Sequence, residues 1–273
     1  SIDSFPVTSI GSGAFQDESG LAVINLPDSL LSIGVSAFYG SGIRSLDIPD
    51  TVTSIGNSAF RDSDLTSITL PDGLTSISNS LFQGASELTE IDIPDSVTTI
   101  GNDAFIGTGL TEIDLPADLV SVGSSAFEGI AFTELLLPES LISVGSNAFK
   151  GAQITSLLIP DSVQSLGSWS FEASLLETLV LPESASLYGS SVVQVFRYIC
   201  RSLTTLTIGQ EAVSGFNGCE ELSTVTLQDS VKQIGTSAFA YTPSLKSIEL
   251  PSSLESIGVS AFYGSGIRSL DIP

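Results

Sequence analysis

Five acidic side chains recur at a fixed spacing in the middle of the chain. Glu90, Glu112 and Glu134 lie 22 residues apart, and Asp92 and Asp114 follow the first two at a distance of two residues. Carboxylates stacked about 5 Å apart repel one another, unless a hard cation such as calcium takes oxygen atoms from several of them. These residues are therefore weak candidates for calcium ligands. We favour a solvated acidic surface, because the sequence has no calcium-loop motif, and no other cofactor is expected.

Three apolar residues continue the same column of positions. Leu136, Leu158 and Val180 stand where other repeats carry Asp or Thr. A contiguous exposed apolar strip beside an acidic patch is typical of a docking surface for a protein partner. Cover by a neighbouring segment, or simple drift of the sequence, would produce the same pattern, and both alternatives stay open.

Basic and aromatic residues gather in an irregular stretch, 183–221. It contains Arg197, Tyr198 and Arg201 in a chain that is otherwise acidic, and these residues are candidates for partner binding in a local pocket. We favour the other interpretation, a kink that changes the curvature of the array.

The only two cysteines also lie in this irregular stretch. Cys200 and Cys219 follow the repeated phenylalanine of adjacent repeats, so they are within reach of a disulfide if regular stacking persists there. A single pair of cysteines does not identify the cellular compartment.

Catalysis has little support in the sequence. The 273 residues contain no histidine, the commonest general base and metal ligand. Serines are plentiful, but no base or metal set accompanies them as nucleophilic catalysis requires. The chain is therefore predicted not to be an enzyme, and no catalytic residue is assigned.

The elements that must position these side chains are short repeats. Ten repeats carry a proline and twelve carry a phenylalanine at matching positions, as in the arc from Pro49 to Phe60, and the distance from proline to phenylalanine is 11 residues in nearly every copy. In Leu65–Pro71, Ile68 and Leu70 alternate with polar residues, which predicts a short strand with one buried face. Proline then ends the strand, a second short extended segment follows, and the Ala-Phe pair is expected to enter the interior from a short helical turn.

No single repeat can bury its apolar side, so stacking must supply the core. Residues 1–273 are accordingly predicted to form one solenoid of about twelve rungs with ladders of Phe, Ile and Leu inside. The chain starts and stops within a repeat and has no polar cap, which favours a fragment of a longer array.

The recurring motif Leu-Pro-Asp-Ser-Val/Leu-x-Ser-Ile-Gly-x-x-Ala-Phe, at a period of 22–23 residues, closely resembles the BspA-like leucine-rich repeats. The resemblance implies an α/β repeat solenoid, a right-handed coil with a parallel β-sheet, short strands, short helical or 3-10 turns and little regular helix. It also implies a secreted or cell-surface protein that mediates adhesion or protein recognition, without catalytic residues.

The net charge of −23 narrows the class of partner. It argues against nucleic acid and against an anionic membrane, and it favours a cation or a basic protein surface. We expect an extracellular protein, matrix or glycan surface as the partner, and no membrane span is present in the sequence.

A second function class follows from an exact internal duplication. Ser32–Pro49 is repeated without a change at Ser256–Pro273, an offset of 224 residues. This observation favours a structural repeat wall in a long extracellular stalk or filament, with end-to-end or lateral self-association. A block duplication and an assembly artefact would both explain the repeat.

Overall fold

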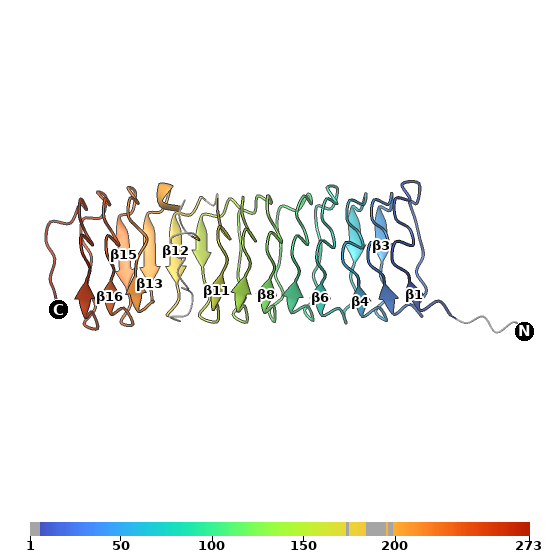
Figure 1. The fold of residues 1–273 in the computed structure, drawn as a ribbon, viewed down its shortest axis with the longest axis horizontal. Helices are drawn as coiled ribbons and strands as arrows, with labels where there is room; N and C mark the ends of the chain where they lie inside the picture. The colour runs from blue at the N-terminus through green and yellow to red at the C-terminus, as the bar shows by residue number, and fades with distance from the viewer. Residues whose placement is uncertain (1–5, 173–174, 184–194, 196–198) are drawn as a thin grey trace, which may run out of the picture.

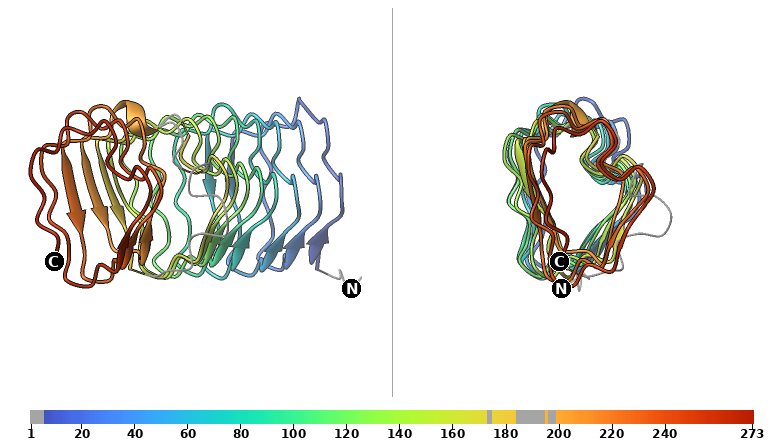
Figure 2. Two further views of the ribbon diagram at one scale, coloured as in Figure 1. Left: turned by 60° about the vertical axis from the view of Figure 1, so that its left-hand side comes forward. Right: turned by 90° about the vertical axis from the view of Figure 1, so that its left-hand side faces the viewer.

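The rungs of the chain stack along one axis into an elongated coil. The computed structural model describes residues 6–172, 175–183, 195 and 199–273. The described chain begins near one end of a nearly straight array and finishes near the other (Figure 1). Viewed down the axis, successive rungs superpose into one closed outline (Figure 2). The fold is therefore the predicted repeat solenoid.

Two walls of short strands run along the coil. The first wall, before each proline position, contains β3 (Ser45–Asp47), β5 (Ser67–Thr69), β10 (Ser156–Leu158), β12 (Thr178–Leu181), β13 (Thr205–Ile208) and β15 (Thr224–Leu227). The second wall contains β1 (Ser9–Ile10), β2 (Ser32–Ile33), β4 (Ser54–Ile55), β6 (Ser76–Ile77), β7 (Thr99–Ile100), β8 (Ser121–Val122), β9 (Ser143–Val144), β11 (Ser165–Leu166), β14 (Ala212–Val213), β16 (Gln233–Ile234) and β17 (Ser256–Ile257).

All strand pairings in the described chain are parallel and join equivalent positions of neighbouring rungs. The first wall holds the sheets β3-β5 and β10-β12-β13-β15, and the second wall holds β1-β2-β4, β11-β9-β8-β7-β6 and β14-β16-β17. In β5, Ile68 is buried between the exposed Ser67 and Thr69. The alternation expected from the sequence is thus confirmed, and the polar residues of the first wall face outward.

The turn before each phenylalanine differs from the expected short helix. Ser58 has a left-handed backbone with φ of 57°, and the N–H of Phe60 donates across to Leu81 O of the next rung at 3.0 Å. The flanking amides of Ala59 and Arg61 donate within their own rung. Because a left-handed residue breaks a helix and alternate amides point to the neighbouring rung, a series of tight turns forms instead. The 3-10 helix of the described chain is η2 (Ile199–Arg201).

Hydrogen bonds between rungs run in both directions along the axis. On the second wall, the N–H of Gly56 donates back to Ile33 O of the preceding rung at 2.8 Å. In the turn, the N–H of Phe60 donates forward. Each rung is therefore held to both neighbours by its own donors and its own acceptors.

Stacked phenylalanine rings fill the interior. The ladder is continuous from Phe15 to Phe171 and again from Phe216 to Phe262, with ring centroids 5.0–6.1 Å apart. The intervening Phe196 lies outside the described residues. The predicted aromatic core is confirmed over both stretches.

A glycine follows most of the second-wall strands and permits close contact between rungs. A Cβ atom on Gly123 would lie 2.5 Å from the carbonyl carbon of Gly101 and 2.6 Å from Asn102 N. A side chain at Gly123 would therefore require the backbone of one of these two rungs to shift.

Candidate functional site

The outward side chains of the first wall form one continuous surface, which we call the strand face. The first-wall strands β3, β5, β10, β12, β13 and β15, with the equivalent segments between them, place these residues in two parallel columns. Leu158 lies opposite Val180 in the pairing of β10 with β12. The surface contains no Lys or Arg. Its residues are Ser45, Asp47, Ser67, Thr69, Glu90, Asp92, Glu112, Asp114, Glu134, Leu136, Ser156, Leu158, Thr178, Val180, Thr205, Thr207, Thr224 and Thr226.

The acidic column lies on this face around a shallow depression. Glu90, Asp92, Glu112 and Asp114 line a hollow of about 480 Å³, and Glu134 is exposed one rung further along. Among the described residues, no group of three acidic or cysteine side chains is placed so that it could hold a metal ion. The arrangement is an open acidic surface with a negative electrostatic potential.

The apolar strip is most open to solvent at the end that adjoins the acidic column. Leu136 is 87% exposed and Leu158 is 53% exposed, whereas Val180 is half-buried. None of the described segments therefore covers Leu136, and the leucine contributes little to the interior. The strip continues the acidic column along the axis, as its position in the repeat predicts.

A small pocket opens beside the strip where the first wall ends in proline. We call it the corner pocket; its volume is about 210 Å³. Apolar groups form one part of its lining and three exposed carboxylates form another. Its lining residues are Glu139, Leu158, Ile159, Pro160, Asp161, Val180, Leu181, Pro182, Glu183 and Gln228.

The sequence does not reveal the corner pocket, because its acids directly follow the proline of each repeat, where a short acidic side chain is explained by the turn. That structural role is present, since the N–H of Glu183 donates to Asp161 Oδ1 at 3.0 Å. The same acids also border the apolar strip. The signal that could have revealed them is an acid at the turn position of consecutive repeats whose outward strand residues are Leu or Val.

An uncharged groove lies on the second wall. It has a volume of about 740 Å³. Its lining consists mainly of small polar residues and glycines in and just after β6, β7, β8, β9 and β11, from Ser76 to Gly167. Trp169, beyond the end of this lining, is 44% exposed and has φ of 59°. Its left-handed backbone is unusual for an aromatic residue. The lining supplies hydroxyl and amide groups together with Ile77, Ile100, Val122 and Val144, and it carries no charged side chain.

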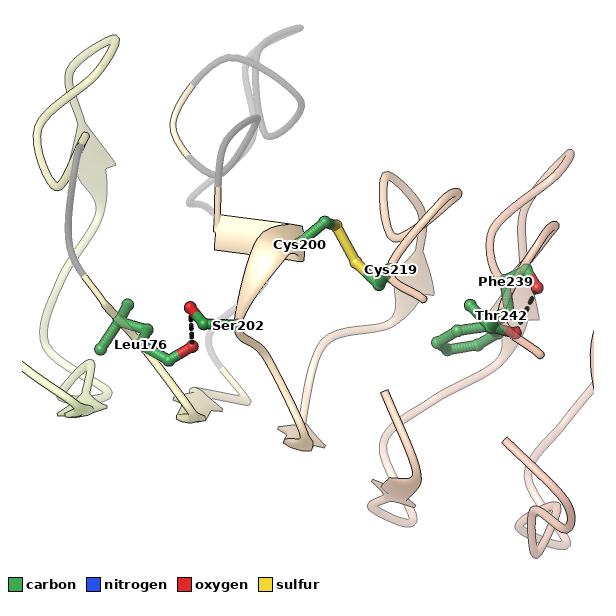
Figure 3. The surroundings of a disulfide bond; sticks show 6 residues. All are labelled: Leu176, Cys200, Ser202, Cys219, Phe239 and Thr242. Carbon is green, nitrogen blue, oxygen red and sulfur yellow. Dashed lines mark hydrogen bonds between the residues drawn. A yellow bond between two sulfur atoms is a disulfide. The ribbon is translucent and has the colours of Figure 1, made fainter. Parts of the chain in front are cut away.

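The irregular stretch contains a covalent link between rungs. Cys200 in η2 and Cys219 in the following rung are joined by a disulfide, and Cys219 is buried (Figure 3). Next to it, Ser202 Oγ donates to Leu176 O at 2.9 Å (Figure 3). Arg201 is exposed, whereas Arg197 and Tyr198 lie outside the described residues. The structure thus places only Arg201 of the proposed basic and aromatic group.

Two lysines, Lys150 and Lys232, form ion pairs with acids of neighbouring rungs. Lys150 Nζ lies 3.3 Å from Glu128 Oε1 and 3.8 Å from Glu172 Oε2. Lys232 donates to Glu211 Oε1 at 2.9 Å, and this hydrogen bond, followed by the Glu211 charge, raises the pKa of Lys232 above its ordinary value. These pairs lie outside the strand face, which leaves its acids without lysine or arginine neighbours in the same columns.

Comparison with known proteins finds similarity to leucine-rich repeat proteins. Copies of the family model described as BspA type leucine rich repeat region match residues 4–108, 98–214 and 212–273. A leucine-rich repeat protein from Bacteroides ovatus is 29% identical, with a TM-score of 0.57, and the match covers 94% of this chain and 68% of that one.

Two further solved structures show lower similarity. The pneumococcal vaccine antigen PcpA is 23% identical with a TM-score of 0.45, over 83% of this chain and 71% of that one. A leucine rich cell surface protein from Faecalibacterium prausnitzii is 24% identical with a TM-score of 0.37, over 94% of this chain and 84% of that one. The search of curated proteins found no match.

Proposed function

The chain belongs to the BspA-type leucine-rich repeat family, and from this membership we propose that it is a non-enzymatic recognition or adhesion protein that binds a protein partner through its strand face. The observation that carries the proposal is the exposure of Leu136 and Leu158 within a row of acidic and polar residues. A contiguous row of exposed apolar side chains is typical of the centre of an interface.

The proposed location is the cell surface or the extracellular space. The family resemblance supports this location, and so does the Cys200–Cys219 disulfide, because disulfides persist mainly in oxidising environments. In the part of the chain that the structure describes, no helix is long and apolar enough to cross a membrane.

The experiment introduces a negative charge at the two most exposed residues of the apolar strip. We expect the double variant Leu136→Asp with Leu158→Asp to bind purified extracellular matrix proteins and cultured cell surfaces at least tenfold more weakly than the parent chain. The reason is that a carboxylate at either position must lose its water when it is placed against the apolar part of the interface. Binding is measured with fluorescently labelled protein, and thermal unfolding is followed by circular dichroism.

Val259→Asp is the matched control, because Val259 is 75% exposed and follows β17 on the second wall, away from the strand face. This variant should bind like the parent. Equal binding by the parent and the double variant would refute the proposal, and a large loss of stability in the double variant would show that the strip belongs to the core.

A further inference from the structure

We propose that the occupant of the strand face is an extended, positively charged polypeptide segment, and that one of its lysine or arginine side chains enters the corner pocket. The inference rests on the proposed function and specifies the chemistry of the partner. Three features of the face lead to it: the charge, the lining of the pocket and their order along the axis.

The charge of the face selects a basic partner. Its acidic residues include Glu90, Asp92 and Glu112, and no Lys or Arg stands among its residues. Exposed charges act on one another over about 8 Å at physiological ionic strength, so neighbouring rungs reinforce the same negative potential. A second copy of this chain would bring a like charge against it, and a nucleic acid would do the same.

The corner pocket fits the two chemical parts of a long basic side chain. Leu158, Val180 and Pro160 offer apolar contact, while the carboxylates of Asp161 and Glu183 lie in the same lining. Lysine and arginine bury an aliphatic stem along apolar surface and keep a charged head at its polar edge. At about 210 Å³ the pocket is smaller than the ~300–1,000 Å³ of sites that hold drug-sized ligands, so it accepts a single side chain.

The order of features along the axis indicates an extended segment. The acidic depression is followed by Leu136 and then by the corner pocket. Successive phenylalanine rings here are 5.0–5.5 Å apart, so the four intervals from the rung of Asp92 to that of Val180 span roughly 21 Å. An extended chain rises about 3.3 Å per residue. About six or seven residues therefore reach from one depression to the other.

The test uses two labelled heptapeptides of equal length and opposite charge, Lys-Lys-Ser-Leu-Ser-Leu-Lys and Glu-Glu-Ser-Leu-Ser-Leu-Glu. Fluorescence anisotropy should show that the lysine peptide binds the intact chain at least tenfold more tightly than the glutamate peptide. Because the attraction is electrostatic, raising the ionic strength should weaken the binding.

Variants of the pocket separate specific binding from attraction to the total charge. The double variant Asp161→Asn with Glu183→Gln should bind the lysine peptide at least fivefold more weakly than the parent chain. Both carboxylate charges are lost in this variant, while the shapes of the side chains are kept. The matched control, Asp28→Asn with Asp50→Asn, removes the same charge at the same turn position in rungs that do not line the pocket. An equal loss in both double variants, or no preference for the lysine peptide, overturns the inference.

The outcomes also distinguish this inference from the proposed function. If the lysine peptide fails to bind but Leu136→Asp with Leu158→Asp still abolishes binding to a matrix protein, the chemistry of the partner is wrong and the function of the face stands. If the leucine variants change neither interaction, both proposals fall.

Discussion

At the residue scale, the phenylalanine ring links each rung to its neighbours by stacking. Phe105 is fully buried and stacks on Phe82 at 5.4 Å and on Phe127 at 5.0 Å. Phe262, in the last rung of the described chain, is half-buried and stacks on Phe239. The same side chain therefore has two different environments in one molecule.

We expect Phe105→Ala to lower the free energy of unfolding by about 3–5 kcal/mol, because the cavity left between two rings cannot close fully. Urea denaturation followed by circular dichroism measures the loss. Phe262→Ala should lower the free energy of unfolding by clearly less, because the ring of Phe262 is already partly exposed to solvent. Equal losses for the two variants would show that the ladder does not act through burial.

At the scale of the element, the sequence pattern predicts the strands but does not predict the conformation of the turns. The alternation around Ile68 and the repeated proline predict a short strand with a defined end, and β5 confirms it. The turn before phenylalanine depends on a left-handed residue such as Ser58. Serine is compatible with many backbone conformations, so its residue type alone does not reveal this one.

The stacking of elements gives a second stability prediction. Gly123→Ala should lower the free energy of unfolding by about 1–3 kcal/mol, the usual cost of overpacking, because the new Cβ would lie 2.5 Å from the backbone of the preceding rung. The measurement is again urea denaturation.

Gly73→Ala provides the comparison for this variant. No atom outside its immediate chain neighbours lies within 4 Å of a Cβ built on Gly73. That substitution should leave stability unchanged or raise it slightly, because alanine restricts the unfolded chain. A neutral Gly123→Ala variant would mean that the rungs can separate at little cost.

At the scale of the whole molecule, the sequence revealed the solenoid and half of the candidate site. The 22–23-residue period specifies both the stacking and the column that carries Leu136. The corner pocket was missed because it forms from residues of several rungs, Glu139, Asp161 and Glu183 among them. Each of these acids is explained locally by its turn, so their joint contribution becomes visible only when the rungs are stacked.

The net charge of −23 should make the stability of the whole array sensitive to salt. Screening of the mutual repulsion is expected to raise the thermal midpoint between 10 and 200 mM sodium chloride by about 2–4 °C, the shift that ~1 kcal/mol produces in a domain of this size. Exposed ion pairs such as Lys150 with Glu128 are weakened by salt but contribute little. A midpoint that falls with salt would show that attraction, and not repulsion, dominates the surface.

The direction of the hydrogen bonds between rungs has a mechanical consequence. They run along the coil axis, and the described chain enters and leaves the coil near opposite ends (Figure 1). Tension applied through the two ends of the polypeptide therefore loads a terminal rung first, and the inner rungs keep their contacts until it has peeled away. At about 3.3–3.6 Å per residue, each rung of 22 residues would release roughly 75 Å of chain, so the array would yield to force in small steps and dissipate work at each one.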